Sequence, residues 1–174
     1  MDNKVKQIVS YFLQLNKKAA QDDDIEPITH LKMQKLVYYA QGMSFAYLKQ
    51  PLFSGDIEAW QHGPVLPCLY EYLKDYKKSN LMDKEELMCS CDSLGDDEKE
   101  LLEMTFRKYG IFTAFRLRDM THQESPWCDN YHRGEKNKIP NEQIKCFFEN
   151  DLEKEVLELQ RLKETDEELK SLWL

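Results

Sequence analysis

The 174-residue sequence contains little glycine and little proline, with six residues of each. Proteins built from many short strands need these residues at their frequent turns, so the scarcity disfavours β-sandwiches and β-barrels and favours helices. Hydrophobic residues make up 41% of the chain and aromatic residues 11%, which is enough apolar material for a core. We therefore expect a folded and mainly helical protein, not a disordered chain.

A long hydrophobic run is missing as well. No stretch of about 18 apolar residues occurs, so the sequence predicts no membrane span. The first residues, 1–6, lack the continuous apolar stretch of a secretory signal. Five cysteines, an odd number, are scattered along the chain, as a reducing compartment allows. Together these features predict a cytoplasmic protein.

The sequence also lacks a local excess of positive charge. It has 24 Lys and Arg against 32 Asp and Glu, which gives a net charge of −8 at pH 7. The tightest basic pairs, at residues 17–18 and 77–78, each have acidic neighbours. Because an acidic chain repels phosphate backbones and anionic lipids, we expect neither nucleic acid nor a membrane surface as a partner.

Motifs of common catalytic sites are absent from the sequence: it has no G-x-S-x-G, no phosphate-binding glycine loop and no H-E-x-x-H. Cys128 and His132 have a spacing that can ligate zinc, with His122 nearby, but a fourth ligand would have to come from afar, such as His62. Buried or hydrogen-bonded side chains around Trp127 are the simpler interpretation. We expect no enzyme activity, no cofactor and no bound metal.

Apolar residues recur at helical spacing along most of the chain. The expected helices cover residues 3–20, 29–47, 64–73, 96–110 and about 112–120, followed by a long helix after Pro140. Thr29 and Asp96 are expected N-caps, and Pro64 suits the first turn of its helix. The helix at 29–47 has bulky apolar residues on all sides, which predicts a central position. With at most a short β element near residues 52–60, the predicted fold class is mainly α, a compact single-domain helical bundle.

Three blocks of sequence stand out in a fixed order. They are residues 28–42 (ITHLKMQKLVYYAQG), residues 51–53 with 57–65 (PLF and IEAWQHGPV), and residues 108–110 with 121–122, 126–127 and 139–148. Together they closely resemble the Panacea domain, the SocA-like antitoxin family. The resemblance implies a compact helical domain over residues 1–148, with residues 149–174 as a C-terminal extension.

The resemblance also implies a function. Members of this family neutralise a toxin by direct protein–protein binding and occur in two-gene toxin–antitoxin operons and in prophages. The namesake type also presents its toxin to a cytosolic AAA+ protease. The alternative is a phage-associated or prophage-associated interaction module, or a proteolytic adaptor, without a dedicated toxin. No cofactor and no catalytic residue belongs to the family pattern.

Polar and aromatic residues recur within the three blocks. We expect them to be structural, because polar groups beside large aromatic rings at the ends of helices commonly serve as buried hydrogen-bond anchors. They are Thr29, His30, Lys35, Tyr38, Tyr39, Gln41, Gly42, Trp60, His62, Gly63, Pro64, His122, Pro126 and Trp127.

Two surfaces are candidates for binding the partner. The first is an apolar stripe in the C-terminal extension, formed by Leu159, Leu162, Leu169 and Trp173. Their heptad-like spacing suits another helix, either of a toxin or of a second copy of the chain, although the stripe could equally dock onto its own core. Residues 149–170 hold nine acidic and four basic residues, which suits a basic toxin.

The second candidate surface is the loop at residues 62–64 together with Tyr70 and Tyr72. Tyrosines provide large amphipathic contacts at a low cost in conformational entropy, which is typical of interfaces. We expect both tyrosines to contact the partner.

Overall fold

The structure is a computed structural model that describes residues 2–20, 25–76 and 79–171, and describes side chains as far as residue 156. Its helices are α1 (Asn3–Ala19), α2 (His30–Tyr47), α3 (Pro67–Leu73), α4 (Asp96–Tyr109), α5 (Ala114–Thr121), α6 (Ser125–Cys128) and α7 (Asn141–Ser171), with short 3-10 helices at Lys74–Tyr76, Leu81–Asp83 and Glu85–Leu87. Its strands are β1 (Ile57–Trp60), β2 (Gly63–Val65) and β3 (Asn137–Ile139). The predicted class, mainly α with a long C-terminal helix, is confirmed.

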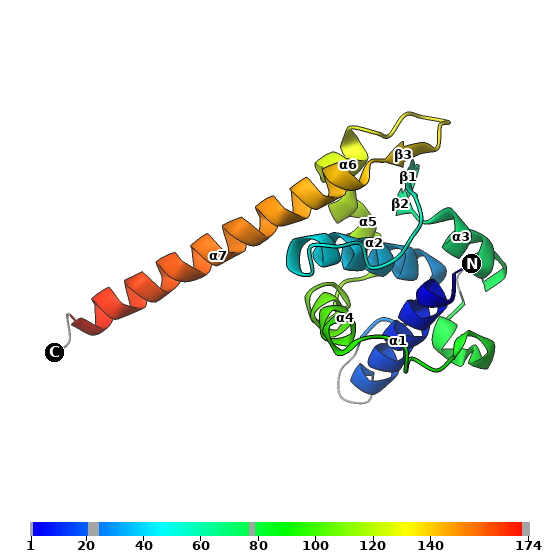
Figure 1. Cartoon of the computed structure of the whole chain (residues 1–174), viewed down its shortest axis with the longest axis horizontal. Coiled ribbons are helices and arrows are strands. Elements are labelled where there is room, and N and C mark those ends of the chain that lie inside the picture. The colour runs from blue at the N-terminus through cyan, green and yellow to red at the C-terminus, as the bar shows by residue number, and fades with distance from the viewer. Residues whose placement is uncertain (1, 21–24, 77–78, 172–174) are drawn as a thin grey trace.

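Helix α2 lies at the centre of the molecule, with α1, α4 and α5 around it and the first turns of α7 beside it (Figure 1). Every residue from Lys32 to Ala46 is buried, as expected for a helix that is apolar on all sides. The predicted cap is also confirmed, because the Thr29 hydroxyl accepts a hydrogen bond from the Lys32 N–H at 3.4 Å. Helices α1, α3, α4, α5 and α7 and strand β2 are therefore positioned against one buried helix.

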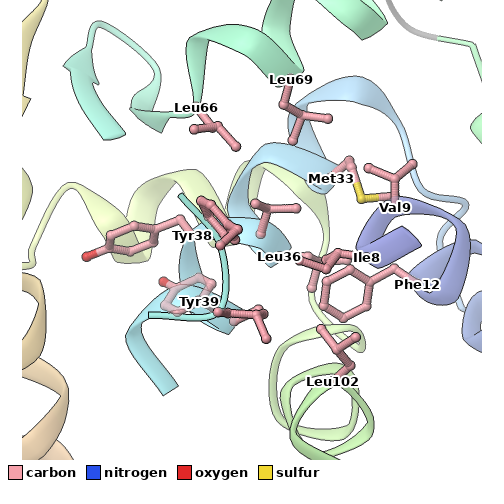
Figure 2. Close-up of a cluster of buried hydrophobic side chains, with 14 of the residues drawn as sticks. Ile8, Val9, Phe12, Met33, Leu36, Tyr38, Tyr39, Leu66, Leu69 and Leu102 are labelled. Atoms are coloured by element: carbon pink, nitrogen blue, oxygen red, sulfur yellow. The ribbon is translucent and has the colours of Figure 1, made fainter. Parts of the chain in front are cut away.

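The main apolar cluster joins α2 to its neighbours. Figure 2 shows Ile8 and Phe12 of α1, Met33 and Leu36 of α2, and Leu102 of α4 within one group of side chains. All five are fully buried. None of the helices in the described residues is both long and apolar enough to cross a membrane.

The small sheet is antiparallel, with strand order β2-β1-β3. Only the region of β1 was expected from the sequence, because β3 is three residues long and is selected by pairing with a strand some 80 residues earlier. The expectation for Pro64 was wrong: it lies in β2 opposite Ala59, and α3 begins at Pro67. Asp96 is likewise the first helical residue of α4 and not its cap, which is Gly95.

Helix α7 begins against the body and then extends away from it (Figure 1). Its start is held by close packing, because the Phe148 ring occupies the space that a side chain at Gly42 would need. Further along, Lys108 of α4 forms ion pairs with Asp151 and Glu155.

The predicted stripe lies beyond this docked part of α7. The side chains of Leu159, Leu162 and Leu169 lie outside the described part of the structure, and so does the whole of Trp173. The stripe and the boundary between residues 148 and 149 therefore stay predictions.

Candidate partner-binding site

The polar residues of α2 point into the interior and hold two irregular segments. The Gln41 side-chain oxygen accepts hydrogen bonds from the backbone N–H of Leu52 at 2.9 Å and of Phe53 at 3.3 Å. In the same way the Gln34 oxygen accepts one from Leu66 at 2.9 Å. Buried backbone N–H groups need hydrogen-bond acceptors, and these segments belong to no helix or strand that could supply them. The side chains of α2 supply the acceptors instead. The segment before β1 and the one before α3 are thereby fixed in place.

Lys35 anchors the β1–β2 hairpin. Its fully buried ammonium donates a hydrogen bond to the Pro64 carbonyl at 2.7 Å. Gly63 has a φ of 95°, and a side chain on it would contact both Lys35 Nζ and the Thr121 hydroxyl at under 3 Å. Burial lowers the pKa of Lys35 to about 7, while the Glu124 carboxylate opposes that shift. The glycine and the lysine thus form one packing unit.

Glu124 anchors the turn between α5 and α6. Its carboxylate is buried and accepts hydrogen bonds from the phenols of Tyr38 at 2.9 Å and Tyr39 at 2.8 Å. Burial raises the pKa of Glu124, and the two phenol hydrogen bonds oppose the rise because they stabilise the carboxylate. Tyr39 also stacks on Tyr109, with ring centroids 3.8 Å apart. The sequence analysis did not select Glu124, since nothing local distinguishes it from other acidic residues.

Trp127 joins the α6 region to the hairpin. Its ring stacks between His122, at 4.0 Å, and Tyr131, at 4.5 Å, and its indole N–H donates to the Trp60 carbonyl at 2.9 Å. Cys128 uses its thiol to donate to the His122 carbonyl at 3.2 Å. We call these buried hydrogen bonds and ring contacts around α2 the buried framework. Most of the polar and aromatic residues singled out in the sequence lie in it or beside it: Thr29, Lys35, Tyr38, Tyr39, Gln41, Gly42, Gly63, Pro64, His122, Pro126 and Trp127. That the role of these residues is structural stays a prediction.

A cavity of about 490 Å³ opens between the start of α2, the β1–β2 hairpin, α3 and residues 131–136. Its aromatic and imidazole lining comes from His30, Trp60, His62, Tyr70 and Tyr131. The Tyr70 ring lies 5.0 Å from that of His30 and 4.9 Å from that of Trp60. Such a wall of rings offers a large apolar contact with polar edges, the chemistry found at interface anchors.

Two cations complete the cavity, Arg133 and Lys136. The Lys136 ammonium lies 3.9 Å from the centroid of the Trp60 ring, in a cation–π contact. Within the described residues neither cation forms an ion pair with a carboxylate. The sequence analysis missed both residues, because two cations in a mixed-charge loop carry no local signal.

His30 forms part of the cavity wall. Burial, reinforced by the Lys35 ammonium, lowers the pKa of His30, so its imidazole is neutral at pH 7. Its Nε2 atom is buried and has no hydrogen-bond partner within the described residues. His30 therefore contributes a neutral ring to the cavity lining, with its Nε2 atom enclosed by the protein.

The structure separates the two tyrosines that we expected to act together. Tyr70 lines the cavity with His62, as the sequence-based interpretation proposed. Tyr72 packs against the core elsewhere, where the Lys6 ammonium lies 5.9 Å from its ring centroid. Two residues along a helix correspond to about 200° of rotation, so neighbouring tyrosines on α3 face opposite directions.

Comparison with known proteins identifies a family match over the region that contains most of these residues. Residues 33–128, more than half of the chain, match the family described as Antitoxin SocA-like, Panacea domain. Antitoxin SocA of Caulobacter vibrioides (strain NA1000 / CB15N) is 45% identical over 58 residues, which cover 33% of this chain and 29% of that protein. No solved structure matches the chain.

The buried Lys35 predicts a specific pH dependence of stability. Its pKa is 10.5 when unfolded and about 7 when folded, so between these values the unfolded chain binds more protons. The free energy of unfolding should therefore rise with pH in this window, by up to about 1.4 kcal/mol per pH unit. Lys35→Met should remove this contribution. Between about pH 7.5 and 9.5, the free energy of unfolding measured with urea should therefore rise more steeply with pH for wild type than for the variant. The exposed Lys17→Met is the control, and parallel curves for wild type and Lys35→Met would contradict the prediction.

Proposed function

Because this chain belongs to the SocA-like Panacea domain family, we propose that it is an antitoxin that neutralises a cognate toxin by direct protein–protein binding, without catalysis. The family match carries this proposal. It spans α2, the hairpin and the helices as far as α6, which are the elements that build the buried framework. The site of action would be the cytoplasm, where a toxin can be captured as it is made.

The cavity supports binding as the mode of action. Tyr70 and Trp60 present rings on a fixed scaffold, and rigid aromatic side chains lose little entropy when a partner covers them. Part of the cavity, residues 131–136, lies outside the matched stretch, and so does α7. A shared framework with variable rims suits a family in which similar domains oppose different toxins.

Helix α7 would provide a second contact. It extends beyond the body for many turns, and residues 149–170 hold nine acidic and four basic residues (Figure 1). We propose that this acidic arm attracts a basic surface of the toxin and holds it through the stripe of Leu159, Leu162, Leu169 and Trp173. Pairing of two copies through the same stripe, and delivery of the toxin to an AAA+ protease, are the competing uses of the arm.

The proposed function is tested by co-expression with the product of the neighbouring gene. Expression of that product alone should arrest growth, and co-expression of this chain should restore growth and copurify with the product as a stable complex. Growth arrest without rescue or copurification would contradict the antitoxin proposal. It would favour the alternative, an interaction module or adaptor without a dedicated toxin.

The two tyrosines of α3 provide a matched pair of variants. Tyr70→Ala should weaken toxin binding by about tenfold or more, because it removes a central ring of the cavity wall. Tyr72→Ala should leave the affinity unchanged and lower the melting temperature instead, because its ring packs against the core. Calorimetric titration and thermal unfolding of both variants measure the two effects. Equal loss of affinity in both would show that the cavity is not the contact.

Truncation tests the acidic arm. A chain that ends at Val156 keeps the Lys108 ion pairs with Asp151 and Glu155, so its melting temperature should match that of the full chain. Its affinity for the toxin should fall by about tenfold or more, since the apolar stripe is removed together with part of the arm's acidic charge. A chain that ends at Asn150 controls for the ion pairs, which are partly exposed and worth at most about 1 kcal/mol. Unchanged affinity in both truncated chains would exclude the arm from the interface.

A further inference from the structure

The charge around the cavity is opposite in sign to that of the whole protein. The chain carries a net charge of −8, yet Arg133 and Lys136 both line this cavity without a carboxylate partner within the described residues. Glu135 lies between them in sequence, and its carboxylate instead accepts a hydrogen bond from the Asn137 amide at 2.9 Å. The lining therefore holds two cations against one carboxylate, that of Glu135, so the local charge is positive although the whole chain is acidic.

The rings beside these cations are held in fixed positions. The Trp60 indole N–H donates to Glu58 at 2.7 Å, and the Trp60 carbonyl accepts from Trp127 at 2.9 Å. Lys136 lies over the Trp60 ring, which orients its ammonium toward the cavity lining. A ligand that enters here meets a preorganised apolar wall and two cations, and preorganisation lowers the cost of binding.

The His30 ring belongs to the same side of the cavity. Its Nε2 atom is enclosed by the protein, so the ring offers a bound group its apolar face and no hydrogen bond at this atom. A bound group with an apolar surface would cover the neighbouring Tyr70 ring. A cavity of 490 Å³ has room for such a group, since ligand cavities range from about 300 to 1,000 Å³.

Resting on the proposed antitoxin function, we propose that this cavity is the receptor for an acidic segment of the toxin. A carboxylate of that segment lies between Arg133 and Lys136, and an adjacent aromatic or large apolar side chain covers the ring wall at Tyr70. A guanidinium can hold a carboxylate through two parallel hydrogen bonds, which fixes its orientation as well as its position. An inorganic anion would have no apolar group to cover the Tyr70 ring, and a basic segment would be repelled by Arg133 and Lys136.

This assignment gives the complex a defined orientation. The cavity rim is positive, whereas the α7 arm from residue 149 is acidic. A toxin that binds both must present an acidic segment to one and a basic surface to the other. Reversed docking would bring like charges together at both contacts, so the two patches together select one orientation.

The chemistry of the cavity is tested on the full chain without the toxin. The probe is the acetylated, amidated tripeptide Glu-Phe-Glu, titrated into isotope-labelled protein and followed by NMR. We expect saturable shifts of the Trp60 indole N–H and of the amides of residues 133–136, with a dissociation constant on the order of 1 mM or lower. The tripeptide Lys-Phe-Lys should cause none. Absence of these shifts, or equal shifts with Lys-Phe-Lys, would overturn the proposal.

Two variants and a second probe define the site. Arg133→Ala/Lys136→Ala should abolish the shifts with Glu-Phe-Glu, and Lys17→Ala/Lys18→Ala should not, because the latter lysines lie at the end of α1, outside the cavity lining. Adenosine monophosphate is the competing probe. If it binds here and the tripeptide does not, the cavity is a site for small anionic ligands, and the proposal is wrong.

Toxin binding by wild type and by a cavity variant distinguishes the proposed role of the cavity from the proposed antitoxin function. Arg133→Glu/Lys136→Glu should weaken toxin binding by about tenfold or more, while Lys17→Glu/Lys18→Glu, with the same change in net charge, should have little effect. Failure of the wild-type chain to bind the toxin would contradict the antitoxin function. Tight binding by wild type and by the cavity variant alike would contradict only the assignment of the acidic segment.

Discussion

The structure depends on one constraint: α2 is buried over nearly its whole length, so each polar side chain that it carries must find a partner inside the protein. Gln34 and Gln41 meet this requirement by bonding to the backbone of segments that have no regular structure of their own. Lys35 does so through the Pro64 carbonyl, and Tyr38 through the carboxylate of Glu124. The same contacts that satisfy the helix therefore fix the α5–α6 turn and the hairpin, and the hairpin forms one side of the cavity.

The buried framework and the proposed contact surface thus use different residues. The framework consists of buried groups whose partners lie within the chain, whereas Tyr70, Arg133 and Lys136 contribute little to it and face the cavity. The matched family stretch, residues 33–128, contains the framework but ends before the two cations and before α7. Substitutions in the rim or in the C-terminal arm would therefore leave the buried contacts of the interior in place.

Opposite charges on the two proposed contact surfaces also give physical meaning to the acidic composition. Net charge by itself only disfavours partners of the same sign, such as nucleic acid. The distribution of charge is more informative, because the acidic excess is concentrated in the extension from residue 149 and the cavity carries the unpaired cations. Attraction at two sites of opposite sign would favour one orientation of a partner, and the rings of the cavity would then supply the apolar burial that holds it.

Features that depend on neighbouring residues could be predicted without a structure: the helical class, the Thr29 cap, the central position of α2 and the resemblance to the family. Periodicity and capping are local, so they are visible without a fold. The tertiary structure was needed to show which proline begins α3, since Pro64 and Pro67 both suit a helix start and pairing of β2 with β1 places Pro64 in a strand. It likewise decided that Glu124 is the buried partner of two tyrosines and that Lys136 lies on Trp60. These contacts join residues some 75 to 86 positions apart, and no local pattern encodes a meeting that the path of the whole chain creates.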